Sequence, residues 1–196
     1  MTRAEHATRE LVLVRHAKSA WPDLPDRDRP LAPRGRRQAP LVGKWLRAGG
    51  CLPDLVLCST ARRARETWQL MAVELGAPVH VTHEERIYGA DAVSLLDLIR
   101  QVPEEVRTLL LVGHAPGIPD LTLLLAGDRR AVSAGNKAGN SAGNSAGDAA
   151  GDVLRRASGK FPTAGVAVLA IAGAWSALEP GRAQLTDFTV PRDLES

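Results

Sequence analysis

Short apolar runs alternate with helical segments along most of the chain, and this alternation limits the folds that it can adopt. The runs at 11–14, 55–58 and 108–112 consist mostly of Leu and Val, and each is followed by a segment with a helical pattern. Continuous apolar runs are typical of strands buried on both faces, and their alternation with helices favours a mostly parallel sheet. We therefore predict an α/β fold, a three-layer α/β/α sandwich around a mostly parallel central sheet.

The same pattern sets the expected order of the elements. We expect strands at 11–14, 55–58, 79–82, 108–112, 165–172 and 185–190. We expect helices at 33–49, 61–75, 92–99 and 118–125. Pro33 suits a first helical turn, and Asp91 is suited to cap the third helix. Pro40 interrupts the first helix, so we expect a kink or a later start there.

One segment departs from this rhythm. From Ala134 the chain repeats a tetrad of Ala, Gly, Asn or Asp, and a small residue. Such a composition buries too little surface to offset the entropy lost on ordering. We expect residues 133–152 to form a flexible insertion in a surface loop. Only Asp148 and Asp152 are acidic within it, so a calcium-binding repeat is improbable.

Composition excludes several classes of protein. The 196 residues suit a single domain, 1–196, and the net charge of +3 lacks the aromatic interleaving of a nucleic-acid binder. No apolar stretch reaches the roughly 20 residues of a membrane span, and the N-terminus lacks a signal peptide's apolar region. The cysteines and histidines show no metal-ligand spacing. We therefore expect a cytoplasmic protein with no nucleic acid or membrane partner, no metal and no cofactor.

Three predicted strands end in residues suited to phosphoryl chemistry. The carboxyl ends of parallel strands meet at one edge of a sheet, where ligands bind. A guanidinium binds phosphate oxygens in a bidentate manner, and a neutral imidazole is a good nucleophile. The residues are Arg15 and His16 after the first run, Ser59, Arg62, Arg63 and Arg65 after the second, and His114 after 108–112.

A further basic cluster follows the first predicted strand. Its members, Arg27, Arg29, Arg34, Arg36 and Arg37, lie within eleven positions. Either they form a solvated basic surface, or they form a rim that steers phosphorylated substrates inward.

These motifs resemble the histidine phosphatase superfamily, also called phosphoglycerate mutase-like. The resemblance rests on RHAKS at 15–19, S-x-A-x-R-A-x-x-T at 59–67 and LLVGHAPG at 110–117. The blocks RHAKSAW, DRPLAPRGRRQA and FPTAGVAVL are similar to those of the SixA-type phosphohistidine phosphatase branch. The resemblance runs from about residue 11 to residue 194 outside the insertion, and it implies a phosphoglycerate mutase-like fold.

The resemblance also implies a role for each matching residue. His16 takes the position of the nucleophile that carries the phosphoryl group, and Arg15 and Arg63 match the two arginines that clamp the phosphate. His114 matches the second histidine, which stabilises the transferring group. Arg62 and Arg65 are expected to be surface or salt-bridge residues. Ala17 replaces the family's usual glycine, and its methyl group is expected to narrow the pocket.

The general acid is the open question at this site. Glu85 begins an E-R-x-Y-G segment like the one that supplies the acid in the mutase branch, so Glu85 is the candidate. Glu84, or a surface role for Glu85, are the alternatives. An imidazole leaving group needs protonation less than an alkoxide does. A Glu85 outside the pocket would therefore favour phosphohistidine or aryl phosphates as substrates, and a Glu85 inside it would favour alkyl esters.

The resemblance implies a metal-independent phosphatase that forms a covalent phosphohistidine and acts on phosphohistidine in proteins. The alternatives are a broad-specificity phosphomonoesterase for small phosphoesters and a non-catalytic module that binds phosphate or phosphoproteins. Mutase activity is less favoured because the chain lacks bulk for a closed sugar-phosphate pocket.

Overall fold

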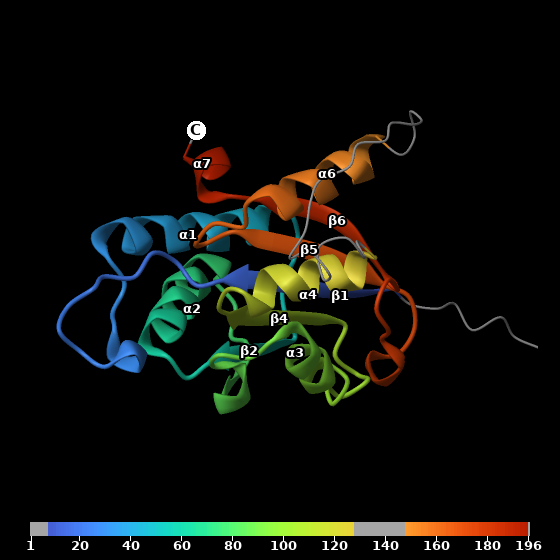
Figure 1. Ribbon diagram of the computed structural model, residues 1–196, viewed down its shortest axis with the longest axis horizontal. Helices are drawn as coiled ribbons and strands as arrows, with labels where there is room; N and C mark the ends of the chain where they lie inside the picture. The colour runs from blue at the N-terminus through green and yellow to red at the C-terminus, as the bar shows by residue number, and fades with distance from the viewer. Residues whose placement is uncertain (1–7, 128–147, 196) are drawn as a thin grey trace, which may run out of the picture.

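A computed structural model describes residues 8–127 and 148–195, and its centre is a six-stranded sheet (Figure 1). The order across the sheet is β3-β2-β4-β1-β5-β6. Strand β5 is antiparallel to both of its neighbours, and the other adjacent pairs are parallel. The strands are β1 (Arg9–Arg15), β2 (Leu55–Ser59), β3 (His80–Glu84), β4 (Thr108–Gly113), β5 (Val166–Ile171) and β6 (Ala183–Thr189).

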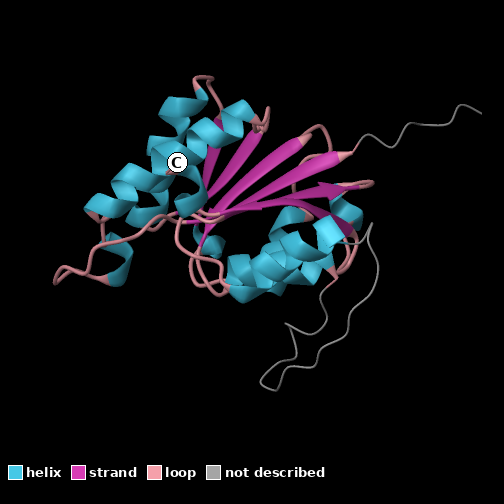
Figure 2. Ribbon diagram, turned by 90° about the horizontal axis from the view of Figure 1, so that it is seen from above, coloured by secondary structure: helices cyan, strands magenta, loops and turns pink. Residues whose placement is uncertain are grey.

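Helices cover both faces of this sheet, as the view along its edge shows (Figure 2). They are α1 (Pro33–Ala48), α2 (Arg62–Leu75), α3 (Ala92–Ile99), α4 (Gly117–Ala126), α6 (Asp148–Gly159) and α7 (Pro191–Leu194). Side chains of β1 alternate between the faces. Leu11 and Leu13 join the core under α3, α4 and α6, whereas Val12 and Val14 join the core under α1 and α2. The predicted three-layer α/β/α sandwich is confirmed.

Local signals placed the ends of most helices correctly. The Asp91 side chain accepts a hydrogen bond from the amide of Ser94 at 2.8 Å, as a capping residue should. Gly76, with φ of 69°, ends α2 in the left-handed conformation. Helix α1 begins at Pro33 and continues through Pro40, so the later start considered for this helix is wrong.

The predicted insertion needs a correction at its C-terminal end. Its residues 133–147 lie outside the described part of the chain, but 148–152 belong to α6. This helix contributes Val153, Leu154 and Ala157 to the core on the α3–α4 side. These apolar residues directly follow the low-complexity repeat. We infer that their packing against the core stabilises the helix, including residues 148–152, whose composition alone indicated a loop.

The chain direction brings several loops to one edge of the sheet. The register pairs Arg15 with Gly113, so the residues that follow β1 and β4 are neighbours. Because β5 is antiparallel to β1, the loop before β5 lies at the same edge, where the Arg15 amide donates to the carbonyl of Gly165 at 3.1 Å. None of the helices within 8–127 and 148–195 is long and apolar enough to cross a membrane.

Candidate active site

Two imidazoles meet at this edge of the sheet. His16 follows β1 and His114 follows β4, and their ring centroids are 5.1 Å apart. Each histidine is only 9% exposed. The expectation that these two residues share a pocket therefore agrees with the geometry, and their proximity follows from the parallel register of β1 and β4.

The orientation of His16 is set by its own backbone neighbour. Its Nδ1 lies 2.8 Å from the carbonyl oxygen of Ala17. Because a carbonyl only accepts hydrogen bonds, this contact assigns the proton to Nδ1 and leaves a lone pair on Nε2. Arg63 Nε donates to that Nε2 at 3.3 Å. The reactive nitrogen of a neutral imidazole thus points toward a guanidinium.

Burial also keeps His16 neutral. Loss of hydration lowers its pKa to about 3, and the proximity of His114 and the positive charges of Arg63 and Arg15 oppose protonation further. The hydrogen bond to Ala17 acts in the opposite direction and is outweighed.

Arg63 connects His16 to a carboxylate that its sequence position did not mark as functional. Asp26 lies in a 3-10 turn, Asp26–Asp28, between β1 and α1. Arg63 Nη2 donates to Asp26 Oδ2 at 2.9 Å, and Arg63 Nη1 donates to the Asp26 carbonyl at 2.6 Å. Arg29 and Tyr88 also donate to this carboxylate, at 2.8 and 2.6 Å. The hydrogen bond from Tyr88 is the main cause that lowers the pKa of Asp26, so the residue is an anion.

His114 is held by contacts on two sides. Its Nε2 lies 2.7 Å from Ser59 Oγ, and its ring packs edge-on against Tyr88 at 5.5 Å between centroids. Its Nδ1 is buried and has no hydrogen-bond partner within the described residues. Burial lowers the pKa of His114 to about 4, and the charge of Arg63 lowers it further. A phosphate dianion near this ring would favour its protonated form.

Arg15 stands beside the two histidines. Its Nη1 donates to the carbonyl of Phe161, in the loop before β5, at 2.7 Å. Its Nε is buried without a partner among the residues that the structure describes. Arg15 and Arg63 therefore flank the imidazole pair, which brings together four of the five residues expected from the sequence.

Glu85 lies at the solvent-exposed border of the histidine site. Its side chain is 56% exposed and accepts hydrogen bonds from Arg27 and from Thr60 Oγ1, the latter at 2.6 Å. The hydrogen bond from Arg27 is the main cause that lowers the pKa of Glu85. Glu84 accepts in turn from Arg86, which lowers its pKa as well. Both carboxylates are ionised in this arrangement and hold no proton to donate.

Ala17, which stands where the family usually has glycine, packs into the core. It is fully buried in the hydrophobic cluster on the α1–α2 face of the sheet. Its amide donates to Thr67 Oγ1 at 3.0 Å, and Thr67 Oγ1 donates to the carbonyl of Arg63 at 2.6 Å. Thr67 thus joins the loop after β1 to the first turn of α2. Arg62 forms a salt bridge with Glu66, as expected of a surface residue.

The site includes residues that sequence reasoning missed. Asp26 lies two positions before the block DRPLAPRGRRQA, which begins at Asp28, and Tyr88 belongs to the segment that begins at Glu85. Ser59 was placed at a strand end without a role. The signal that indicates a role for Ser59 is its position at the carboxyl end of a predicted strand, and Tyr88 and Asp26 carry no such signal.

Comparison with known proteins agrees with this geometry. The family model of the histidine phosphatase superfamily (branch 1) matches residues 11–115, a range that begins in β1 and contains His16, Arg63 and His114. The chain belongs to the histidine phosphatase superfamily.

Individual relatives extend the match to most of the chain. An uncharacterized protein of Mycobacterium tuberculosis (strain H37Rv) is 47% identical over 180 residues, which cover 91% of this chain and 100% of the relative. A SixA structure from Nakamurella multipartitia is 36% identical with a TM-score of 0.74, over 94% of this chain and 96% of that one. A SixA structure from Agrobacterium tumefaciens is 28% identical with a TM-score of 0.71, over 93% and 98%.

The fold is that of the phosphoglycerate mutase-like proteins. The family model and the similarity to SixA phosphohistidine phosphatase structures together support phosphatase activity for the chain. In the ranges 8–127 and 148–195, no group of three or more His, Cys, Asp or Glu side chains is placed to hold a metal ion.

Proposed function

We propose that this phosphatase hydrolyses phosphohistidine in proteins, through a covalent phosphohistidine on His16 and without a metal. The observation that carries the proposal is the hydrogen bond from His16 Nδ1 to the Ala17 carbonyl, which leaves Nε2 unprotonated beside Arg63. The SixA proteins whose structures this chain resembles are named for phosphohistidine phosphatase activity, which is consistent with it.

The first step transfers the phosphoryl group to the enzyme. The lone pair of His16 Nε2 forms a bond to phosphorus while the P–N bond of the substrate breaks, with the two nitrogens in line. The electron pair of the broken bond returns to the leaving imidazole, which departs neutral because its other ring nitrogen carries a proton. Arg15 and Arg63 donate hydrogen bonds to the equatorial oxygens and offset their negative charge.

The second step restores the enzyme. Water attacks the phosphorus, the bond to His16 Nε2 breaks and its electron pair returns to the ring, and the water proton leaves with phosphate or solvent. Within the described residues the Nδ1 of His114 is buried without a hydrogen-bond partner, and a phosphate oxygen would supply one in both steps. Its protonation beside the dianion would add a third positive group to the two guanidiniums.

The ionised and hydrogen-bonded state of Glu85 supports phosphohistidine as the substrate. An alkoxide needs a proton as it leaves, and a general acid contributes on the order of 100-fold or more to that step. Glu85 is ionised and engaged by Arg27 and Thr60, so it is unsuited to that task as it stands. An imidazole leaving group removes the need, which favours phosphohistidine over alkyl phosphoesters. The free cysteines, Cys51 and Cys58, fit our proposal of a cytoplasmic location.

The test compares leaving groups under one set of conditions. We expect kcat/KM for a phosphohistidine peptide to exceed that for a phosphoserine peptide of the same sequence by on the order of 100-fold. His16→Ala should abolish both activities, and acid-labile radiolabelled phosphate should be trapped on wild-type protein and not on His16→Ala. His83→Ala, at an exposed histidine on β3, is the matched control and should behave as wild type. Equal rates on the two peptides, or full activity of His16→Ala, would refute the proposal.

A further inference from the structure

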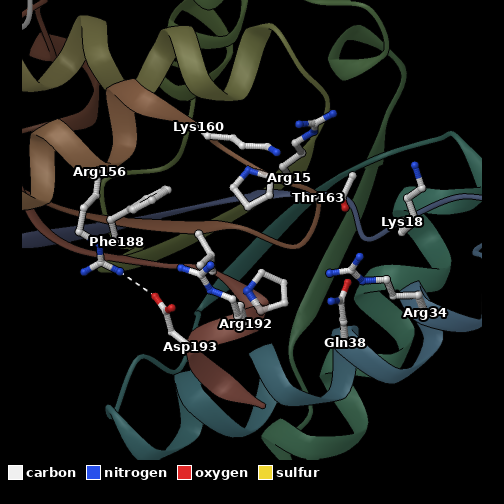
Figure 3. A pocket seen from close by; sticks show the side chains of 13 residues that line it. Arg15, Lys18, Arg34, Gln38, Arg156, Lys160, Thr163, Phe188, Arg192 and Asp193 are labelled. Carbon is white, nitrogen blue, oxygen red and sulfur yellow. Dashed lines mark hydrogen bonds and ion pairs between the residues drawn. The ribbon is translucent and has the colours of Figure 1, made fainter. Parts of the chain in front are cut away.

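A groove adjoins the phosphate site on its β5–β6 side (Figure 3). Its volume is about 590 Å³, which falls within the range of sites for ligands far larger than a phosphate ion. Arg15 lines it, so this residue belongs both to the groove and to the surroundings of His16. The other basic residues that line it are Lys18, Arg34, Arg156, Lys160 and Arg192.

The sheet topology explains why these cations gather. Lys18 follows β1, and Arg34 stands in the first turn of α1. Lys160 follows α6 in the loop that leads into β5, and Arg192 lies in α7, directly after β6. Since β5 is antiparallel and β6 is not, the beginning of β5 and the end of β6 lie at the edge that carries His16. Segments from the two ends of the chain thus supply one basic rim.

The charge of this rim is largely uncompensated. Among the described residues, Asp193 is the only acidic one that lines the groove, and it is already paired with Arg156 at 2.7 Å. Nearby, Glu195 accepts a hydrogen bond from buried Gln38 at 3.0 Å. Lys18, Arg34, Lys160 and Arg192 form no ion pair with any acidic side chain in the described ranges. Like charges around one concave surface raise the local concentration of anions.

The structure also bears on the two interpretations of the basic cluster at 27–37, a solvated surface or a rim that steers phosphorylated substrates. Arg27 binds Glu85, Arg29 is buried beside Asp26, and Arg36 binds Glu66. Arg34 lines the groove and has no such partner. The cluster is therefore neither a uniform solvated surface nor a continuous rim.

The floor and the rim differ in character, which indicates the kind of anion that fits. The floor includes the buried or half-buried apolar side chains of Phe188, Pro162, Val190 and Pro191. The cations other than Arg15 are exposed and stand on long side chains around the groove (Figure 3). A site for an isolated phosphate would offer buried side-chain donors, such as Arg63 beside His16. Exposed cations above an apolar floor suit a peptide segment that carries carboxylates.

We propose that this groove binds acidic side chains of the phosphoprotein substrate and places the neighbouring phosphohistidine beside His16. The inference rests on the proposed function and adds a substrate preference to it. Acidic residues near the phosphorylated histidine would pair with Lys160, Arg192 and Arg34, while the polypeptide between them covers the apolar floor.

Charge reversal in the groove tests the idea. The variant Lys160→Glu/Arg192→Glu changes two exposed residues that contact neither histidine. With a phosphohistidine peptide whose flanks are rich in Glu, we expect KM to rise by about tenfold and kcat to stay unchanged. With a Ser-flanked phosphohistidine peptide and with an aryl phosphate, both parameters should stay within about twofold of wild type. The difference between the two peptides should disappear as salt is raised to roughly 0.5 M.

Arg182→Glu is the control for net charge, because Arg182 is exposed next to the start of β6, at the opposite edge of the sheet. It reverses one charge where the groove variant reverses two, so a general effect of net charge would raise KM about threefold in this variant, and that result would overturn the proposal. So would equal use of the two peptides by wild type, although the phosphatase proposal would survive that result.

A binding measurement tests the proposed groove independently of the proposed hydrolysis of phosphohistidine. A fluorescent Glu-rich peptide without phosphate should bind to wild type and to His16→Ala alike, and about tenfold more weakly to Lys160→Glu/Arg192→Glu. Undiminished binding to the groove variant would overturn the inference whatever the enzyme hydrolyses. No binding of the fluorescent peptide to wild type, together with tighter binding of tripolyphosphate to wild type than to Lys160→Glu/Arg192→Glu, would assign the groove to a small polyanion and overturn it as well.

Discussion

The hydrogen bond from His16 Nδ1 to the Ala17 carbonyl depends on the conformation of the loop after β1. It leaves Nε2 of the same ring unprotonated. An exposed imidazole titrates near pH 6.5, but burial lowers the pKa of His16 to about 3. We therefore expect the His16 ring resonances, measured by NMR, to stay constant between pH 8 and pH 5 in the Nδ1–H tautomer. A midpoint near pH 6.5, or the Nε2–H tautomer, would remove the nucleophile from our mechanism.

Asp26 gives a second prediction at the residue scale. Its carboxylate binds Arg63, one of the two guanidiniums proposed to clamp phosphate, and its charge repels a dianion. Asp26→Asn keeps an acceptor for Arg63 but removes the charge, so we expect inorganic phosphate to inhibit aryl phosphate hydrolysis about threefold more strongly. The matched control is Asp28→Asn in the same turn, which should leave the inhibition constant unchanged.

Weaker inhibition by phosphate in Asp26→Asn would contradict this prediction. It would show that the carboxylate mainly orients Arg63, through its contacts with Arg29 and Tyr88, rather than competing for it.

Some residues of the site can be predicted from the sequence alone, and others cannot. His16, His114, Arg15 and Arg63 could be predicted because each occupies a strand end or a helix start, positions that the chain pattern itself indicates. Asp26 and Tyr88 could not, since their roles depend on loops that fold over the sheet edge from 62 positions apart. The engagement of Glu85 by Arg27 is likewise set by tertiary contacts.

At the level of elements, alanine substitutions at two helical glycines distinguish the effect of a steric clash from the effect of helix propensity. Gly117 begins α4, three residues after His114, and a Cβ there would overlap the carbonyl oxygen of Ala90. Gly117→Ala should therefore cost about 1–3 kcal/mol of unfolding free energy and lower kcat/KM, because α4 must move from the loop that carries Tyr88. Urea denaturation and an aryl phosphate assay measure the two effects.

Gly151 is the control for this substitution. It lies in α6, and nothing stands within 4 Å of the position that a Cβ would occupy. Gly151→Ala should be neutral or stabilise the protein by up to about 1 kcal/mol, since alanine favours the helix. A Gly117→Ala protein as stable as Gly151→Ala would show that the approach of α4 to Ala90 is not tight.

The elements themselves were predictable to different degrees. Strands β1, β2 and β4 are buried on both faces, so their apolar runs stood out from polar surroundings. Helix α6 could not be predicted, because its residues 148–152 belong to a segment rich in Ala and Gly, and Val153 and Leu154 of this helix pack against the core.

For the molecule as a whole, the antiparallel placement of β5 decides what lies next to the phosphate site. The apolar run at 166–171 predicted a strand but not its direction. With β5 reversed, the loop at 160–165 reaches Arg15, and the chain's last helix joins the same edge. The basic groove and the contact of Arg15 with Phe161 are therefore consequences of one strand direction that the amino-acid pattern left open.

The two buried histidines also affect the stability of the whole fold. Below about pH 6.5 the unfolded chain binds protons at both rings, whereas the folded chain does so only near pH 3 at His16 and near pH 4 at His114. Because the unfolded state then binds more protons, the free energy of unfolding falls as pH decreases through this window. Between pH 6.5 and pH 5 the loss should reach up to about 2 kcal/mol for each histidine.

Urea denaturation at pH 7 and pH 5 measures this loss, and the double variant His16→Asn/His114→Asn isolates its source. Asparagine is neutral at both pH values, and at position 16 its amide can still donate to the Ala17 carbonyl. The variant should therefore lose most of the pH dependence that wild type shows in this window, while carboxylates such as Asp26, whose pKa is lowered, contribute only in more acidic solution. An equally steep decline in the double variant would mean that the two imidazoles are protonated in the folded protein. The neutral nucleophile, and with it the proposed phosphoryl transfer to His16, would then have to be abandoned.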